Sequence, residues 1–359
     1  GIALIGLLLF WVTPLPAEPF EEGPLHVSFK SAQLQGESYV FQITQAPDGQ
    51  IIAAGEQVIF YQDNRWGVVP QLRRPVIHNL LVDRHTLWVS SLNEIGRLEL
   101  PLRSTSHYEA LPIPALASAG EFWQVEKLGD ELVAVTNEEV WFINPQSLSA
   151  RHVKLPNKTR LGLIRWQNTL LVTQPGSPIW LLEDGQLKPF ENPLPDKTDM
   201  LWLWSNESLV LTDRAIYKKE SGGYRRVLEI GSLNKQGVIT STTPWGRYLA
   251  VSTWTKGLVL FDLESAQTRF VTPASVLPSL VLAKVFTDRN GRLWVGSSQG
   301  ITVLESPKYG HEIAPKNHAI EAGRVDGLFI SYEDRTEYFH VDGREEILPR
   351  TYEFLQTRQ

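Results

Sequence analysis

The sequence predicts an all-β fold, a β-propeller of about seven four-stranded blades, and three observations support this prediction. Short apolar runs rich in Val, Ile and aromatic residues recur along the 359 residues, separated by Gly, Pro and polar turns. Such runs are typical of strands. No segment keeps the period of an amphipathic helix. Finally, the runs return at intervals of about 40 residues, which is the length of a propeller blade.

The interval is measured from one apolar residue that stands at the same place in each repeat. The clearest repeat is VFTDRNGRLWVGSSQGITVLE (285–305), in which this residue is Leu293. Similar strands occur upstream in GQIIAAG, HTLWVSS, DELVAVT, NTLLVTQ, ESLVLTD and RYLAVST. The corresponding residues are Ile51, Leu87, Leu132, Leu170, Leu209 and Leu249.

Each repeat has the same internal order. An apolar strand leads to a polar turn, and a second strand ends in small residues. A third strand follows, such as ITVLE (301–305), and then a polar, Pro-containing stretch that could hold the outer strand. Asp48-Gly49 and Asn290-Gly291 supply the positive φ angles of tight hairpins. The innermost strands are predicted to begin near residues 41, 79, 122, 161, 200, 238 and 282.

The two ends of the repeat region bear on the number of blades. The stretch PLHVSFKSAQ (24–33) resembles a strand and could pair into the last blade to close a ring over residues 26–305. An eighth, weaker repeat follows at 319–343. An eight-bladed ring is therefore the alternative. Otherwise residues 319–359 form a partial extra blade or the start of a truncated second propeller.

The N-terminal segment is predicted to be a signal peptide over residues 1–17. It is apolar from Gly1 to Val12, about a dozen residues, which is short for a bilayer span. Leu15-Pro16-Ala17 resembles a small-residue cleavage site. This pattern predicts export, and an uncleaved anchor or a buried strand are the alternatives.

Composition and motifs argue against several function classes. The chain has no Cys, which excludes a disulfide framework, a Cys-ligated metal and a cysteine nucleophile. A net charge of -6 without a basic run argues against binding to nucleic acid. The eight His are dispersed, and no hydrolase elbow, phosphate loop or EF-hand is present. We therefore expect no catalytic residues, no metal site and no cofactor, although a propeller can assemble a site from single residues of several blades.

Five of the 12 Trp residues are assigned to two groups. Trp88 and Trp294 stand on second strands beside small residues, where they are predicted to be wedges between blades. Trp123 and Trp204 lie on predicted innermost strands, and Trp254 lies in the turn STWTKG. These three are candidate ligand-binding residues, because an aromatic ring at the mouth of a propeller can stack on a sugar or another flat ligand. Packing within the blades is the alternative.

One charged residue is a further candidate for ligand binding. Arg165 in LIRWQN could be a channel charge that binds an anionic ligand. A solvated turn residue is the alternative interpretation.

The clearest repeats resemble the two-component regulator propeller repeat. That repeat has an apolar run, Asp, a Gly turn, Leu-Trp-Val-Gly-Thr and then Gly-Leu. Residues 285–305 match it well, and residues 79–100 match it moderately, whereas the third to fifth copies lose the Trp and most glycines. The period covers residues 26–343. The matching residues are Asp288, Gly291, Leu293, Trp294, Gly296, Ser297 and Gly300, then Asp83, Leu87, Trp88, Ser91 and Gly96.

The resemblance implies a periplasmic sensor region. In that family such propellers commonly occur in tandem before a membrane span and a histidine kinase, a diguanylate cyclase or a DNA-binding output domain. The expectation is thus a non-catalytic, ligand-sensing part of a bacterial receptor, tethered to the membrane and homodimeric through the full-length receptor. Its partner would be an unidentified small molecule or glycan. The alternatives are a free-standing secreted propeller that binds a protein or glycan, and a propeller lyase or hydrolase.

Overall fold

The computed structural model describes residues 26–305 except 75, 156, 160, 184, 192, 195–200, 206–207, 231–238 and 272–275, together with the backbone of four short strands between residues 319 and 348. The side chains of residues 71, 73 and 201–205 also lie outside the description. The chain divides into two units, residues 1–306 and 307–359. The predicted signal peptide over residues 1–17 lies outside the described residues.

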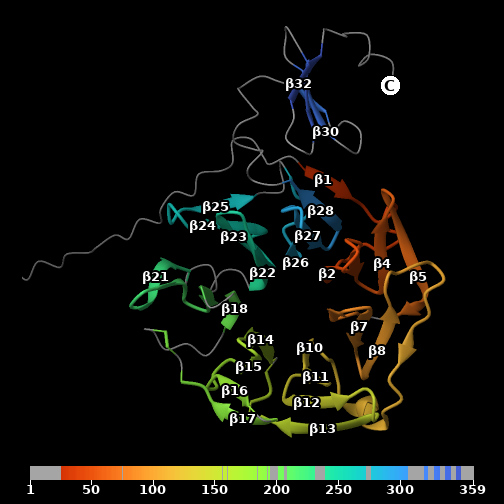
Figure 1. The fold of residues 1–359 in the computed structure, drawn as a ribbon, viewed down its shortest axis with the longest axis vertical. Coiled ribbons are helices and arrows are strands. Elements are labelled where there is room, and N and C mark those ends of the chain that lie inside the picture. The colour runs from red at the N-terminus through yellow and green to blue at the C-terminus, as the bar shows by residue number, and fades with distance from the viewer. Residues whose placement is uncertain are drawn as a thin grey trace, which may run out of the picture. The chain divides into compact units, whose positions relative to one another are not determined.

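The first unit is a ring of seven four-stranded antiparallel blades (Figure 1). Consecutive strands pair within each blade, and the innermost strand of each blade lies beside that of the next blade around the whole ring. The strands of the first three blades are β2 (Gln42–Gln45), β3 (Ile51–Ala54), β4 (Gln57–Gln62), β5 (Arg65–Arg73); β6 (Asn79–Asp83), β7 (Thr86–Ser91), β8 (Glu94–Glu99), β9 (Glu109–Ala110); and β10 (Gln124–Leu128), β11 (Glu131–Val135), β12 (Glu139–Asn144), β13 (Ser149–Lys154).

The other four blades continue this order, and the short 3-10 helix η1 (Pro114–Ser118) links blades 2 and 3. Their strands are β14 (Gly162–Trp166), β15 (Thr169–Thr173), β16 (Trp180–Glu183), β17 (Gln186–Pro189); β18 (Leu201–Ser205), β19 (Leu209–Thr212), β20 (Ala215–Glu220), β21 (Gly223–Glu229); β22 (Ile239–Trp245), β23 (Tyr248–Thr253), β24 (Leu258–Asp262), β25 (Thr268–Val271); and β26 (Leu282–Thr287), β27 (Leu293–Ser297), β28 (Gly300–Leu304) with β1 (His26–Phe29).

The predicted propeller is confirmed, including the positions of its innermost strands. These strands begin at residues 42, 79, 124, 162, 201, 239 and 282, each within two residues of the predicted start. The ring closes at seven blades because β1 pairs antiparallel with β28, with Phe29 opposite Ile301. The last blade is therefore built from both ends of the repeat region, as the strand-like stretch at 24–33 predicted.

The hydrophobic core lies between neighbouring blades. Trp88 of blade 2 packs with Phe122 and Trp141 of blade 3, and Trp294 of blade 7 packs with Trp66 of blade 1. Both of the predicted wedges, Trp88 and Trp294, are at most 5% exposed, which confirms that prediction. Burial of such large aromatic surfaces is a main source of the cohesion between blades.

Polar side chains on the innermost strands add a second link between blades. The Gln42 side-chain amide donates to the backbone oxygen of His78. Asn79 Oδ1 accepts a hydrogen bond of 3.2 Å from the Val125 N–H, and Gln124 Oε1 accepts one of 2.7 Å from the Leu163 N–H. These side chains thus satisfy backbone groups at the inner edges of blades 2, 3 and 4, as buried or half-buried peptide groups require.

The second unit contains one four-stranded antiparallel sheet. Its order follows the chain, with β29 (Ala319–Glu321), β30 (Gly327–Ser331), β31 (Thr336–His340) and β32 (Glu345–Leu348). The eighth repeat therefore forms a blade-like sheet that takes no part in the seven-bladed ring. That residues 319–359 begin a second propeller stays a prediction.

Candidate ligand-binding face

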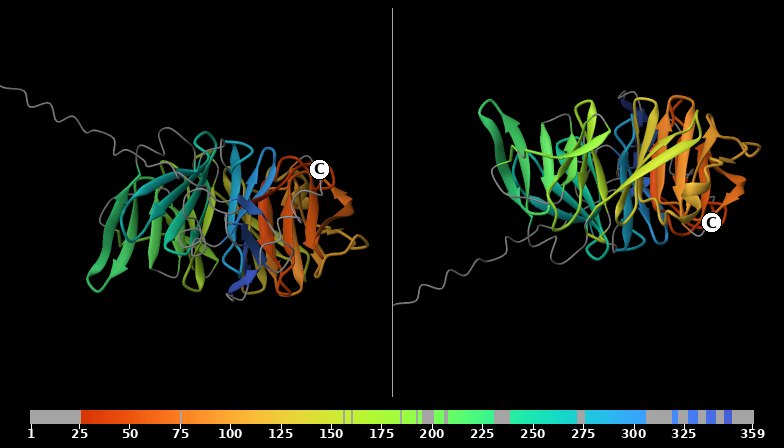
Figure 2. Two further views of the ribbon diagram at one scale, coloured as in Figure 1. Left: turned by 90° about the horizontal axis from the view of Figure 1, so that it is seen from above. Right: turned by 90° about the horizontal axis from the view of Figure 1, so that it is seen from below.

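Strand direction divides the ring into two faces, between which the strands run (Figure 2). Successive strands of a blade are antiparallel. The start of the first strand and the turn between the second and third strands therefore lie on one face, which we call the entry face. The turns between first and second and between third and fourth strands lie on the opposite, exit face. This division decides which candidate residues can meet.

Trp123 lies on the entry face, directly before β10. Its indole Nε1 donates a hydrogen bond of 2.8 Å to Oδ1 of Asn137, which stands in the turn between β11 and β12. Its ring also lies 4.4 Å from the ring of His78, centroid to centroid. Because His78 directly precedes β6, these contacts fix Trp123 at the junction of blades 2 and 3.

An acidic side chain stands beside this histidine. The Nε2 atom of His78 lies 3.7 Å from Oε1 of Glu121, which is an ion-pair distance but longer than a hydrogen bond. His78 is 9% exposed and Glu121 is 42% exposed. The entry face thus holds an imidazole and a carboxylate close together, the pairing that acid–base chemistry would need once the two groups came within hydrogen-bonding distance.

A second aromatic group on the entry face contains Trp254, in the turn between β23 and β24. Trp254 is 41% exposed. Its ring centroid lies 6.3 Å from that of Tyr39, which in turn lies 4.1 Å from that of Phe41. Burial raises the pKa of the Tyr39 hydroxyl, so Tyr39 stays neutral at physiological pH. The three rings, named here the Trp254 cluster, offer a partly exposed apolar surface.

A buried carboxylate fixes the segment that carries Tyr39 of the Trp254 cluster. Glu37 is 4% exposed, and its Oε1 accepts hydrogen bonds from the backbone N–H groups of Ser38 and Tyr39 at 3.1 and 3.3 Å. Its Oε2 accepts hydrogen bonds from the N–H groups of Glu56 and Gln57 at 2.8 and 3.1 Å. The segment that carries Tyr39 is therefore fixed to the turn between β3 and β4. A preorganised surface of this kind loses little entropy when it binds a ligand.

The other two candidate residues are placed elsewhere. Arg165 stands next to the last residue of β14, toward the exit face, and its Nη2 lies 2.9 Å from Glu126 Oε2 and donates to Lys127 O at 2.6 Å. Its charge is thus paired with the neighbouring blade. The backbone of Trp204 pairs with Val210 near the β18–β19 turn, also toward the exit face, and its side chain lies outside the described residues. Trp123 and Trp254 share a face, and the others do not join them.

Sequence reasoning missed several residues of the entry face. His78, Glu121, Tyr39 and Phe41 lie immediately before innermost strands, so their position in the repeat was a usable signal. The spacing of the histidines was compared with that of metal sites, and their position before an innermost strand was not considered. Among the described residues no group of three His, Asp or Glu side chains is close enough to hold a metal ion. No helix in the described part of the chain has the length and apolar character to cross a bilayer.

Comparison with known proteins places this geometry in a structural context. No protein-family model matches the sequence, and no curated protein matches it. An extracellular domain from B. thetaiotaomicron, described as part of the hybrid two component system BT3049, matches 91% of this chain with a TM-score of 0.60 and 14% identity. That of BT4673 matches 93% with a TM-score of 0.62, also at 14% identity. The chain has the propeller fold of these extracellular domains.

Coverage differs between the two kinds of structural neighbour. The chain spans about half of these extracellular domains, 49% of the first and 48% of the second. A streptogramin B lyase is covered over 97% of its own length by 78% of this chain, with a TM-score of 0.58 and 14% identity. At such identities the likeness establishes the fold alone.

Proposed function

We propose that the chain is the ligand-sensing, non-catalytic propeller region of a bacterial signal-transduction receptor, located in the periplasm. The observation that carries the proposal is the likeness over more than 90% of the chain to extracellular domains described as belonging to two component systems. The repeat over residues 285–305 supports it through its resemblance to the propeller repeat of such receptors.

The entry face supplies the recognition surface in this proposal. A rigid ring can hold its loops in place while they differ from protein to protein, so binding residues concentrate on such loops. Trp254 is 41% exposed, and Trp123 directly precedes the innermost strand β10 on the same face. Both rings can stack on the apolar face of a sugar or a flat metabolite. Signalling then requires that the ligand bind two receptor states with different affinity.

The test is a thermal-shift screen of the full chain against metabolites and glycans. A ligand that binds only the folded state raises the unfolding midpoint. Trp254→Ala and Trp123→Ala should weaken the binding of a hit by about tenfold or more, the scale of losing one stacked aromatic contact. Leu148→Ala is the matched control, because Leu148 is 45% exposed in a turn on the exit face. Binding that survives loss of both Trp residues would contradict the assignment of the entry face.

A lyase is the second candidate, and His78 and Glu121 are the observation that favours it. The 3.7 Å separation of Nε2 and Oε1 would shorten to a hydrogen bond with a small side-chain movement. Two of the solved structures with a similar fold are a streptogramin B lyase and a virginiamycin B lyase. NMR can monitor whether the protein converts a screening hit into a product. Conversion that His78→Ala abolishes without loss of binding would establish this candidate. Hits that stay unchanged over long incubation would count against it.

A further inference from the structure

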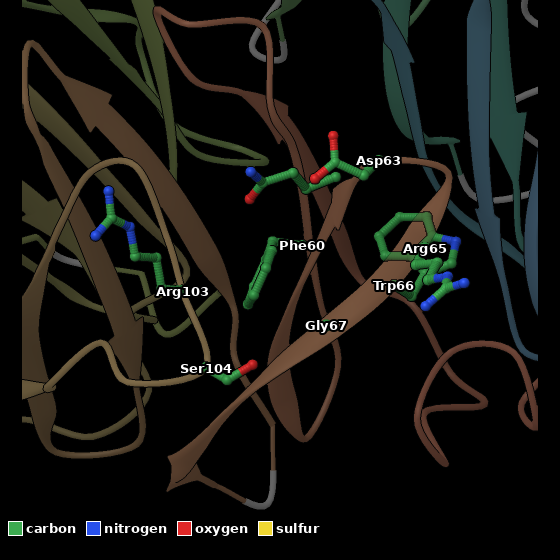
Figure 3. Close-up of a pocket in the computed structure, with 8 residues that line it drawn as sticks. Phe60, Asp63, Arg65, Trp66, Gly67, Arg103 and Ser104 are labelled. Atoms are coloured by element: carbon green, nitrogen blue, oxygen red, sulfur yellow. The ribbon is translucent and has the colours of Figure 1, made fainter.

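A groove of about 560 Å³ lies on the exit face, away from the Trp123 and Trp254 side chains. It is bounded by strands β4 and β5 of blade 1 and by the segment that follows β8 of blade 2 (Figure 3). Its volume is within the range of sites for small molecules, about 300–1,000 Å³. The lining residues used below are Phe60, Asp63, Arg65, Gly67, Arg103 and Ser104.

One wall of the groove is held by a buried amide. The Gln50 side chain, 7% exposed, accepts a hydrogen bond of 2.8 Å from the Leu102 N–H and donates one of 3.0 Å to the Leu102 carbonyl. Leu102 itself is fully buried. A residue of blade 1 therefore fastens the blade 2 segment beside Arg103. Ser106 Oγ also accepts a hydrogen bond of 2.9 Å from the Arg103 N–H, which makes this wall a preformed structure.

The opposite wall depends on a glycine. A Cβ placed on Gly67 would lie 2.5 Å from Cζ of Phe60, so no larger residue fits without displacing that ring. Figure 3 shows Phe60 standing between Arg103 on one side and Arg65 on the other. Strand β5 starts after a tight turn in which Asp63 and Asn64 have φ angles of 49° and 60°. The groove thus has a small apolar floor and polar side chains on both walls.

The charges of the groove are unusual for this chain. Most arginines with described side chains pair with a carboxylate, as in Arg74–Glu94, Arg97–Glu109, Arg151–Glu131, Arg225–Glu220, Arg247–Asp262 and Arg292–Asp288. Within the described residues, Arg65, Arg84, Arg103 and Arg289 pair with no carboxylate, although the chain has a net charge of -6. Arg289 donates to the Pro47 carbonyl oxygen. Arg65 and Arg103 line the groove, where their guanidinium groups remain available to an incoming anion.

We infer that this groove binds a small hydroxylated molecule carrying one oxyanion group, such as a sugar acid or a sugar sulfate. Guanidinium groups bind carboxylate and sulfate oxygens with charge-assisted hydrogen bonds. Asp63 and the Ser104 hydroxyl can bind ligand hydroxyl groups. The Asp63 carboxylate also disfavours a second anionic group nearby. The Phe60 edge above Gly67 can contact the C–H face of a saturated ring.

The experiment measures binding of three probes that share one ring to the full chain, by calorimetry and saturation-transfer NMR. The probes are D-glucuronate, D-glucose 6-sulfate and D-glucose. We expect at least one acidic probe to bind at least about tenfold more tightly than glucose. Arg103→Ala should weaken that binding by about tenfold, as expected for loss of a charge-assisted hydrogen bond. Arg84→Ala is the matched control, because it removes another unpaired arginine at the β6–β7 turn, outside the groove lining.

Each outcome has a defined meaning. Binding of glucuronate alone assigns a carboxylate ligand, and binding of the sulfate ester alone assigns a sulfated one. Equal binding of glucose, no binding of any probe, or an equal loss in Arg84→Ala would overturn the inference. The inference does not rest on the proposed sensing role, because Trp254→Ala tests the entry face whereas Arg103→Ala tests the groove.

Discussion

At the scale of single residues, the Asp of the clearest repeat stabilises its turn through hydrogen bonds. Asp288 is 4% exposed, and its Oδ1 accepts hydrogen bonds of 2.9 Å from the Asn290 and Arg292 N–H groups. Its Oδ2 accepts hydrogen bonds of 2.8 Å from Arg292 Nε and Trp294 Nε1. In blade 2 the equivalent Trp88 Nε1 is buried without a partner among the described residues. The sequence motif showed that this Asp recurs, but not which groups it satisfies.

This difference predicts unequal effects of the same substitution in two blades. Asp288→Ala leaves the indole N–H of Trp294 and two turn N–H groups without their acceptor, so we expect a loss of about 2–4 kcal/mol in the free energy of unfolding. Asp83→Ala, at the matching position of blade 2, should cost less than about 1 kcal/mol, because the Trp88 indole has no acceptor to lose. Urea unfolding of both variants measures the two losses in the free energy of unfolding. Equal losses would refute the role of Asp288 in stabilising its turn.

At the scale of elements, the first strands were predictable and the connecting loops were not. Short strands with turn residues between them repeat every forty residues or so, which gave the start of every innermost strand and the closing strand β1. The groove was not predictable, because it depends on contact between Gln50 and Leu102, which belong to different blades. Trp204 and Arg165 were chosen by residue type, yet their positions near the ends of their strands place them toward the exit face.

The closing strand β1 depends on a glycine in its partner strand. Gly300 has a φ of 118°, and a Cβ there would lie 2.1 Å from the carbonyl oxygen of Phe29. Gly300→Ala therefore adds backbone strain and pushes β1 from β28, and we expect a loss of about 2 kcal/mol or more. Hydrogen exchange should show reduced protection of the Val27 to Phe29 amides. Gly222→Ala is the control, because nothing lies within 4 Å of its added Cβ, and an equal loss there would contradict this account.

At the scale of the whole molecule, one strand decides the number of blades. The sequence alone left seven and eight blades open, because an eighth, weaker repeat follows at 319–343. Pairing of β1 with β28 occupies the outer position of the seventh blade and completes the ring. Period alone could not distinguish these cases, since closure depends on a contact between residues more than 270 positions apart, such as Ser28 and Thr302.

The proposed sensing role requires that the propeller lie outside the cytoplasm, and the first 17 residues are predicted to direct it there. The full chain, fused at its C-terminus to a reporter enzyme that folds only in an oxidising compartment, should show reporter activity in bacteria. Removal of residues 1–17 should abolish that activity while the fusion protein still accumulates, because the apolar run from Gly1 to Val12 is predicted to be the export signal. Since the chain has no Cys, an oxidising compartment imposes no disulfide pairing on the propeller itself, so the reporter responds to location alone. Equal activity with and without these residues would refute the signal peptide, and activity from neither fusion would refute export of this chain.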